Sequence, residues 1–434
     1  DLAENIAVNA SAVPVVPPRQ QQGGIEATNY DYLIITRTHL KSGLDTLVDW
    51  REKMGYKVRV LSYSFMPAST SVKNLIQNYH INHGPLKYVV IAGDYADIPY
   101  HVWWGVNSDS WYGCLTGGSN PDFYPDVGIS RLPGNTTSEL ANACYKIYRY
   151  ERYASGSWLT RAMLVAHKEG APGKYEGCCE QVANGNLKSS GWGIIKQYGS
   201  KTGVSPTTVT NHINNGVGLV AYRGHGSTTS WISSWCRYNN AYDTADVMSQ
   251  TNNYKTPVVL NIACTCGNFK SNCLNEVWVN YHKYRNAVAS LGATQASGTT
   301  ANHEYMKEIY RVIFGSGKMT NLYEFWLKGI QKVATMGSYG LKNARMYWWA
   351  GDTVTNLWSR LPRGIYVTKP YSLPTGTHTI NIKASALPSS FVNLGKGTKI
   401  CLFKDGDVQR EHTCVATSNV IFSGVNISSP GYLY

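Results

Sequence analysis

The pattern of apolar and polar positions along the chain predicts alternating strands and helices. Short, almost unbroken apolar runs occupy residues 30–37, 87–92, 162–166, 218–222, 258–263 and 287–293, and segments with apolar residues at helical spacing lie between them, including 40–54, 139–153, 303–314 and 322–333. Strands that lack polar alternation are typical of a parallel sheet that is covered by helices on both faces. The pattern therefore predicts an α/β fold made of two successive α/β units.

The two ends of the chain differ from this pattern. Residues 1–28 contain a proline run and then a Gln/Gly run without any period, which is typical of a tail or linker. From about residue 365, short β-rich runs are separated by Gly, Asp and Asn, and Asp405-Gly406 is a hairpin signal. We therefore expect boundaries at 1–28 for a tail, 29–160 and 161–364 for the α/β units, and 365–434 for a small β-sandwich.

Composition narrows the classes of protein that are possible. With 43% hydrophobic and 15% charged residues among 434, the chain is not a disordered one, and no apolar run approaches the roughly 18 residues of a membrane span. The net charge of +13 arises from scarce acidic residues, without a Lys/Arg run of five or more, so we expect a diffusely basic surface and no nucleic-acid partner. The 31 tyrosines and 13 tryptophans favour an exported protein, and Asp1 begins no signal peptide, so the chain is either cytosolic or already processed.

Candidate chemistry follows two of the apolar strands. Gly224-His225-Gly226 follows the run at 218–222, and Cys264 follows the run at 258–263. Working groups of open parallel sheets lie beyond the carboxyl ends of strands, and a thiol beside an imidazole suits a thiolate nucleophile with a proton carrier. Cysteine is also among the residues most often buried, and a histidine in a glycine-rich turn is commonly a plain loop residue. From these residues alone, the catalytic and the structural interpretation both stay open.

The segments around these two residues resemble a known family. His225 in Tyr-Arg-Gly-His-Gly-Ser-Thr-Thr-Ser-Trp, followed by Cys264 in Asn-Ile-Ala-Cys-Thr-Cys-Gly-Asn-Phe, resembles the gingipain family of cysteine endopeptidases, in the clan of caspases and legumains. From Tyr30 onward, the resemblance implies two caspase-like α/β/α subdomains with mainly parallel sheets, followed by an immunoglobulin-like β-sandwich. We therefore expect a secreted or cell-surface monomer that acts on proteins or peptides.

The resemblance also implies roles for individual residues. Cys264 would be the nucleophile, and His225 the general acid that protonates the leaving amine. Glu169, after the strand at 162–166, would orient the histidine, since a carboxylate that accepts from one ring nitrogen fixes the tautomer. The backbone N–H groups of Gly226 and Cys264 would form the oxyanion hole.

Gingipains select a basic residue on the acyl side of the scissile bond, and the resemblance implies which residues would do so here. The pocket acid falls on Glu180 by analogy with the arginine-specific branch and on Glu304 by analogy with the lysine-specific branch. Thr300 stands where a tryptophan usually caps the pocket. We expect cleavage after Arg or Lys, the alternative being that both acids are ordinary exposed helix residues.

A second cluster suggests structural calcium, and no catalytic metal is expected. The segments in gingipains that resemble this region bind calcium, and the nearest matches are Asp97, Asp122, Asp126 and the backbone carbonyl of Tyr124. Aspartates that simply form turns are the alternative interpretation.

Three other kinds of protein are possible alternatives to a gingipain-like peptidase. No G-x-S-x-G motif is present, which disfavours a serine hydrolase. A non-catalytic adhesin or carbohydrate-binding surface protein could use the same scaffold, but it would need neither Cys264 nor His225. A legumain-like peptidase or transpeptidase of other specificity is the closest chemical alternative.

Overall fold

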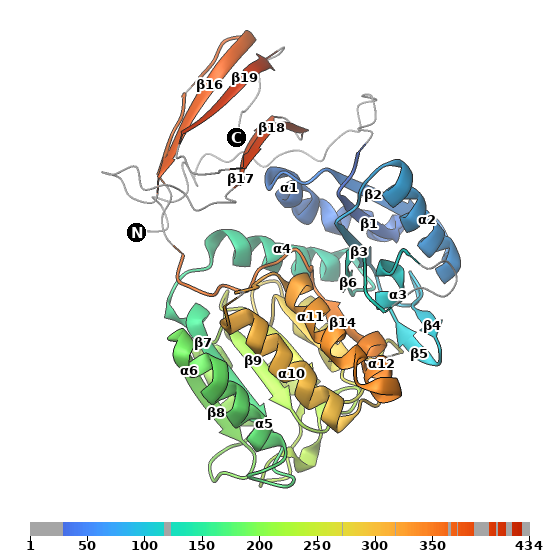
Figure 1. Ribbon diagram of the computed structural model, residues 1–434, viewed down its shortest axis with the longest axis vertical. Helices are drawn as coiled ribbons and strands as arrows, with labels where there is room; N and C mark the ends of the chain where they lie inside the picture. The colour runs from blue at the N-terminus through green and yellow to red at the C-terminus, as the bar shows by residue number, and fades with distance from the viewer. Residues whose placement is uncertain are drawn as a thin grey trace. The chain divides into compact units, whose positions relative to one another are not determined.

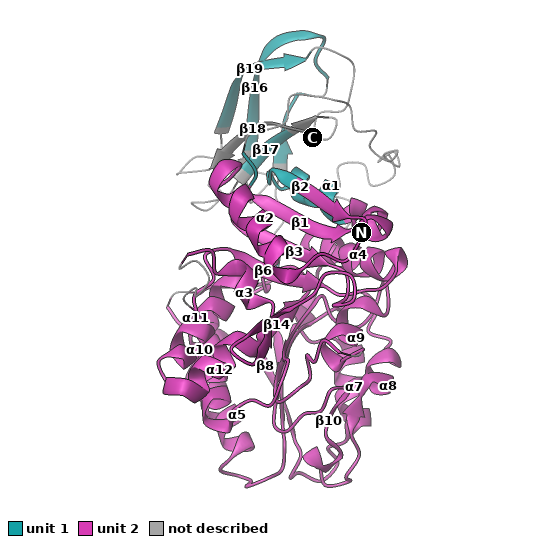
Figure 2. Ribbon diagram, turned by 90° about the vertical axis from the view of Figure 1, so that its right-hand side faces the viewer, with its two compact units in different colours: residues 1–30, 47–58, 362–434 teal, residues 31–46, 59–361 magenta. Residues whose placement is uncertain are grey.

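The computed structural model describes residues 29–116, 123–270, 272–316, 318–362, 366–370, 372–385, 399–404, 407–413 and 419–427. The chain divides into two compact units (Figure 2). The large unit contains residues 31–46 and 59–361, and the small unit contains residues 1–30, 47–58 and 362–434. The predicted tail at 1–28 lies outside the described residues.

The large unit is built on one ten-stranded sheet in the order β2-β1-β3-β6-β14-β13-β12-β9-β7-β8. Its strands are β1 (Tyr32–Arg37), β2 (Val58–Tyr63), β3 (Tyr88–Ala92), β6 (Gly128–Leu132), β7 (Arg161–Ala166), β8 (Gly193–Tyr198), β9 (Leu219–Arg223), β12 (Val258–Ile262), β13 (Ala289–Ala293) and β14 (Tyr347–Ala350). From β1 to β8 in this order, neighbours are parallel except for the antiparallel pair β13–β14. The α/β class is confirmed, and the strands of both predicted α/β units join in this single sheet through β14. The boundary at residue 160 stays a prediction.

Helices cover both faces of this sheet. Within its described residues, the large unit contains α2 (Ser69–Asn82), α3 (Ser110–Gly113), α4 (Thr137–Tyr153), α5 (Tyr175–Val182), α6 (Lys188–Ser190), α7 (Pro206–Asn215), α8 (Thr244–Met248), α9 (Leu274–Asn280), α10 (Thr299–Phe314), α11 (Leu322–Ala334) and α12 (Gly337–Met346), while most of α1 (Asp45–Lys53) belongs to the small unit. Seen edge-on, α10, α11 and α12 lie on one side of the sheet, and α7, α8 and α9 lie on the other (Figure 2). This double cover explains the unalternating strands, because all five residues of β9 and of β12 are buried.

Short elements complete the large unit. Two-stranded pairs are formed by β4 (His101–Trp103) with β5 (Val106–Ser108) and by β10 (Ser230–Trp231) with β11 (Tyr242–Asp243). Short 3-10 helices lie at Thr38–Leu44, Ser157–Thr160 and Ser233–Trp235, and a short π-helix lies at Ala183–Leu187. No helix in the described part of the chain is both long and apolar enough to cross a membrane.

The small unit is all-β in its C-terminal part (Figure 1). β15 (Tyr366–Thr368), β16 (Gly376–Ser385) and β19 (Asn419–Ile427) form a three-stranded antiparallel sheet, and β17 (Lys399–Lys404) pairs with β18 (Asp407–Thr413). Ile380 of β16, Leu402 of β17 and Phe422 of β19 share one buried apolar core. This core between two small sheets agrees with the predicted β-sandwich.

Candidate active site

The two predicted catalytic residues lie at the same edge of the large sheet. β9 and β12 are parallel neighbours, and their register places Arg223 opposite Ile262. His225 and Cys264 each follow two residues after that pair, so the edge at which both strands end carries the imidazole and the thiol. The strand-end argument from the sequence therefore gives their correct positions in the fold.

Glu169 reaches the same edge from the other neighbour of β9. β7 pairs with β9 up to Ala166 and Arg223, and Glu169 follows three residues later. One oxygen of its carboxylate contacts Nε2 of His225, and the other contacts Nζ of Lys174. The hydrogen bonds from Lys174 and His225 lower the pKa of Glu169 to about 2. The carboxylate therefore stays ionised near neutral pH and can hold the ring of His225 in one orientation.

Tyr175 is a site residue that the sequence analysis missed. It is the first residue of α5, it is buried, and its hydroxyl lies 3.2 Å from Nε2 of His225. Its ring meets the ring of His225 edge-on at 5.4 Å. Because Tyr175 and Glu169 both contact Nε2, Nδ1 is the ring nitrogen left for exchange with a substrate.

His167 contacts the backbone of Glu169. Its Nδ1 accepts a hydrogen bond from the backbone N–H of Glu169 at 3.0 Å, and its Nε2 lies 3.1 Å from Oγ of Ser234. Burial, with a contribution from nearby His225, lowers the pKa of His167 to about 4. His167 is therefore neutral at neutral pH, in the tautomer that accepts at Nδ1. No local motif marks it, since its partners come from three different segments.

Cys264 is partly exposed, and two groups of Ser297 contact its thiol. The backbone N–H of Ser297 donates to Sγ at 3.3 Å, and the Ser297 hydroxyl lies 3.7 Å from the same sulfur. Donors of this kind stabilise a thiolate. Thr265, the next residue, has a φ of +52°, which is unusual for a β-branched side chain and turns the chain sharply after the cysteine.

The other cysteines near this edge have a different environment. Cys266 and Cys273 are fully buried, and burial raises the pKa of both thiols. These thiols are therefore protonated and shielded, whereas Cys264 is accessible.

The backbone around Gly226 fits the predicted oxyanion hole. The N–H of Ser227 donates to the carbonyl of Ser230, and the N–H of Ile232 donates to the carbonyl of His225. These two hydrogen bonds lie on either side of Gly226 and do not involve its N–H. Neither Gly226 nor Cys264 donates its N–H to a backbone acceptor within the described residues. A Cβ atom on Gly226 would lie 2.6 Å from both the carbonyl oxygen of Cys264 and Sγ of Cys266. This position therefore needs glycine to let the two loops meet.

Arg223 joins several elements beneath the site. It is the buried last residue of β9, and it donates to the carbonyls of Ile262 at 3.1 Å and Thr299 at 2.8 Å. Its Nε lies 3.2 Å from Nδ1 of His303, and its guanidinium lies 4.8 Å from the ring of Tyr175. Arg223 therefore ties the first turns of α5 and α10 to the edge that carries His225 and Cys264.

The predicted specificity residues lie on the two helices that Arg223 contacts. Glu180 on α5 forms an ion pair with Lys196 at 2.7 Å, and this lysine lowers the pKa of Glu180. Glu304 on α10 contacts Lys307, and Thr300 is exposed in the first turn of the same helix. Among the described residues, neither carboxylate contacts Cys264 or His225, so their role stays a prediction.

Two of the predicted calcium ligands, Asp97 and Asp126, contact other groups of the chain. Asp97 lies 3.7 Å from Arg37 and 3.4 Å from His39, while Asp126 accepts from the backbone N–H groups at 115 and 116 at 2.5 and 3.0 Å. Tyr124 is partly exposed, and Asp122 lies outside the described residues. No group of three or more His, Cys, Asp or Glu side chains in the described ranges is arranged to hold a metal. Calcium therefore stays a prediction.

Comparison with known proteins places the chain in a family. The sequence profile of peptidase family C25 matches residues 25–358, which include His225, Cys264 and Glu169. The chain belongs to peptidase family C25. The predicted resemblance to gingipains is thereby confirmed.

Individual members of family C25 give the same result. Gingipain R2 of Porphyromonas gingivalis is 28% identical over 281 residues, which cover 62% of this chain and 36% of the relative. Gingipain R1 of Porphyromonas gingivalis is 30% identical over 256 residues, covering 56% of this chain and 25% of the relative. The crystal structure of the Arg-specific cysteine proteinase gingipain R superposes with a TM-score of 0.80 at 23% identity, over 93% of both chains. The matched region is thus about a third or less of the curated relatives' length, and the crystal structure confirms the fold.

Proposed function

We propose that the protein is a cysteine endopeptidase in which Cys264 and His225 act as a catalytic dyad. The observation that carries this proposal is the convergence of Cys264, His225 and Glu169 at the ends of three neighbouring parallel strands, within a chain of family C25. A protein that only binds a partner has no need of an accessible thiol beside an oriented imidazole.

In the first step, the thiol proton of Cys264 passes to Nδ1 of His225, and the resulting thiolate attacks the carbonyl carbon of the scissile peptide. The carbonyl oxygen becomes an oxyanion, which the N–H groups of Gly226 and Cys264 stabilise. As the tetrahedral intermediate collapses, the C–N bond breaks and His225 gives a proton to the leaving amine from Nδ1. A thioester on Cys264 remains. Glu169 stabilises the imidazolium that supplies this proton.

In the second step, water hydrolyses the thioester. His225, now neutral, accepts a proton from the attacking water, and the same two N–H groups hold the second oxyanion. The C–S bond breaks, the carboxylic acid product leaves, and Cys264 returns to its starting state. A transpeptidase would differ only in the nucleophile of this step, an amine in place of water.

We further propose cleavage after Arg or Lys. The relatives include gingipain R2 and a Lys-gingipain, and one solved relative is described as Arg-specific. Glu180 and Glu304 lie on α5 and α10, whose first turns border the site, and each carboxylate already has a lysine partner. A basic substrate side chain could replace that lysine in a charge-assisted pair.

Three further expectations accompany this function. We infer a secreted or cell-surface location, supported by the content of tyrosine and tryptophan and the low charge density, and a monomeric state. We also infer structural calcium bound by Asp97, Asp122, Asp126 and the carbonyl of Tyr124. A melting temperature that is unchanged by a calcium chelator would remove the calcium inference.

The function is tested by iodoacetamide labelling near neutral pH with peptide mapping, run beside fluorogenic Arg, Lys and Asn substrates. We expect Cys264 to label fastest and activity to fall in step, while buried Cys266 and Cys273 stay unmodified and serve as internal controls. Turnover of the Asn substrate alone would instead indicate legumain-like specificity. An inert Cys264 with no cleavage would overturn the proposal in favour of a binding protein.

A further inference from the structure

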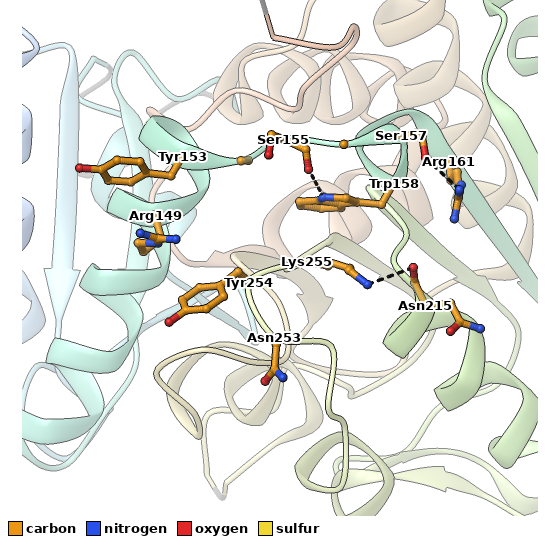
Figure 3. A pocket seen from close by; sticks show the side chains of 12 residues that line it. Arg149, Tyr153, Ser155, Ser157, Trp158, Arg161, Asn215, Asn253, Tyr254 and Lys255 are labelled. Carbon is orange, nitrogen blue, oxygen red and sulfur yellow. Dashed lines mark hydrogen bonds between the residues drawn. The ribbon is translucent and has the colours of Figure 1, made fainter. Parts of the chain in front are cut away.

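A pocket lies at the end of the large sheet where β7 begins, and Figure 3 shows the residues that line it. The candidate active site lies at the other end of the same strands. The volume of the pocket is about 440 Å³, and its residues come from the end of α4, the start of β7, the end of α7 and the loop before β12. The catalytic residues follow the carboxyl ends of the same strands. With about 3.3 Å per residue, the six residues of β7 separate the two edges by roughly 20 Å. The pocket is therefore distinct from the peptidase site.

The lining of this pocket is cationic without any compensating acid. Arg149, Arg161 and Lys255 line it, and no aspartate or glutamate does among the residues that the structure describes. None of the three forms an ion pair within the described residues; Arg161 donates to Oγ of Ser157 at 2.9 Å, and Lys255 lies 3.5 Å from the carbonyl of Asn215. Three positive charges that share one concave site create a field that attracts an anion.

Arg149 is held in place but lacks a hydrogen-bond acceptor. Its guanidinium lies 4.6 Å from the ring of Tyr153 and 4.6 Å from the ring of Tyr254, and Figure 3 shows these side chains together at one end of the pocket. Its Nε is covered by the chain itself and has no hydrogen-bond partner among the described residues. The two rings fix the guanidinium in the pocket lining, so its terminal nitrogens can donate to a ligand there.

The loop that carries Tyr254 adopts an unusual backbone conformation. Asn253 and Tyr254 have φ angles of +24° and +60°, although neither is glycine. The conformation is fixed by the N–H of Tyr254, which donates to the carbonyl of Tyr284 at 2.6 Å. Positive φ at a bulky residue is a genuine outlier, and such residues cluster at ligand sites. Here it presents Asn253, Tyr254 and Lys255 to the pocket.

We propose that this pocket binds a small sugar-like ligand that carries phosphate or sulfate ester groups. Guanidinium groups match tetrahedral oxyanions through paired N–H donors, and a lysine supplies a further charge. The other lining residues include two serines and two asparagines, whose side chains suit hydroxyl groups, and three aromatic residues, whose rings can stack on the face of a sugar. Phosphate and sulfate esters share this recognition chemistry, so the experiment must separate them. The proposal does not depend on peptidase activity.

The test is isothermal titration of the full chain with three probes: fructose 1,6-bisphosphate, a sulfated heparin disaccharide and sucrose. We expect saturable 1:1 binding of at least one ester, weakened by salt, and no binding of sucrose. The ester that binds more tightly shows whether the pocket prefers phosphate or sulfate groups. Saturable binding of neither ester would overturn the proposal.

Matched variants separate a built site from a generally basic surface. Arg149→Gln and Lys255→Gln should each weaken binding about tenfold or more, because each removes a charge-assisted contact. Lys188→Gln removes an exposed lysine on α6, outside the pocket, and should change the affinity less than twofold. Equal weakening by Lys188→Gln and Lys255→Gln would overturn the proposal. Lys255 lies in a loop, so its variant keeps the test valid if Arg149→Gln disturbs folding, and circular dichroism checks both.

Discussion

The carboxylate of Glu169, which follows β7, contacts Nε2 of His225 with one oxygen and Nζ of Lys174 with the other. This relationship leaves Nδ1 of His225 as the nitrogen that can face a substrate. It also keeps the carboxylate ionised at any pH well above its pKa of about 2. We therefore expect Glu169 to orient the imidazole rather than to accept a proton from it.

Glu169→Gln should lower kcat/KM about tenfold to a hundredfold with little change in stability. The loss is expected to be smaller than the ~10⁴-fold loss for a buried triad aspartate, because Glu169 is exposed and solvent screens its charge. Steady-state kinetics on the best fluorogenic substrate measures the effect. Glu308→Gln, which removes a glutamate paired with Arg311 away from the site, is the control. Wild-type kcat/KM in Glu169→Gln would show that the carboxylate does not orient the histidine.

Tyr175→Phe should reduce kcat a few-fold to about tenfold while KM stays unchanged. The substitution removes the hydroxyl 3.2 Å from Nε2 of His225 but keeps the ring that packs against Arg223 and His225. A lost hydrogen bond to a reacting histidine is worth about 1 kcal/mol. Tyr310→Phe removes a buried hydroxyl that has no hydrogen-bond partner among the described residues, so it should leave both parameters unchanged. A rise in KM alone would assign Tyr175 to substrate binding instead.

His167 should make stability fall as the pH is lowered through the range from about 6.5 to about 4. Its pKa is 6.5 in the ordinary state and about 4 in the fold, so the unfolded chain binds more protons in this range. The stabilisation is complete above pH 6.5 and is lost as the pH falls toward the folded pKa. His167→Asn keeps an acceptor for the N–H of Glu169 but cannot titrate here.

Urea denaturation at pH 7.5 and at pH 4.5 tests this dependence by comparing the two proteins. The wild type should lose more stability than His167→Asn between these values. Comparison of the two proteins removes the contributions of other titrating groups, including His303, whose pKa is also lowered to about 4 by burial and Arg223. Identical losses in both proteins would contradict the assignment.

Gly226→Ala should abolish most activity and lower stability by about 1–3 kcal/mol. The added methyl group would meet the carbonyl of Cys264 and Sγ of Cys266 at 2.6 Å, and overpacking of this kind costs that amount. The shift also displaces the N–H groups proposed for the oxyanion hole, which typically costs a hundredfold or more in kcat. Gly185→Ala is the matched control, because nothing lies within 4 Å of its added Cβ. Normal activity in Gly226→Ala would exclude this loop from the site.

The edge that carries His225 and Cys264 was predictable from sequence because its position depends on local signals. β9 and β12 are short apolar runs, and each is followed directly by the reactive residue, so strand ends alone place His225 and Cys264. Supporting residues such as Tyr175, His167 and Ser297 carry no such signal. Each is defined by a partner on a distant segment, and only the folded structure brings those segments together.

The strands that the sequence analysis missed are explained by their side chains. β6 contains Arg131, which interrupts any apolar run, yet Arg131 is fully buried because Asp109 pairs with it at 2.7 and 2.9 Å. A buried ion pair between distant residues leaves no periodic pattern. β14 is short and follows α12 directly, so Tyr347–Ala350 reads as the end of that helix. This missed strand is the one that joins the two halves of the sheet.

Substrate preference is the property that the sequence left most open, and it gives the last prediction. If Glu180 receives a basic side chain, Glu180→Gln should lower kcat/KM for Arg substrates about a hundredfold or more, since a charge-assisted pair is lost. If Glu304 does so, Glu304→Gln should have that effect on Lys substrates. Thr300→Trp, which restores the tryptophan expected above the pocket, should change KM for the same substrate. Lys196→Gln is the control, because it removes the present partner of Glu180 and should not lower kcat/KM for Arg substrates. Unchanged kcat/KM for both substrates in both glutamate variants would place the specificity acid elsewhere in the chain.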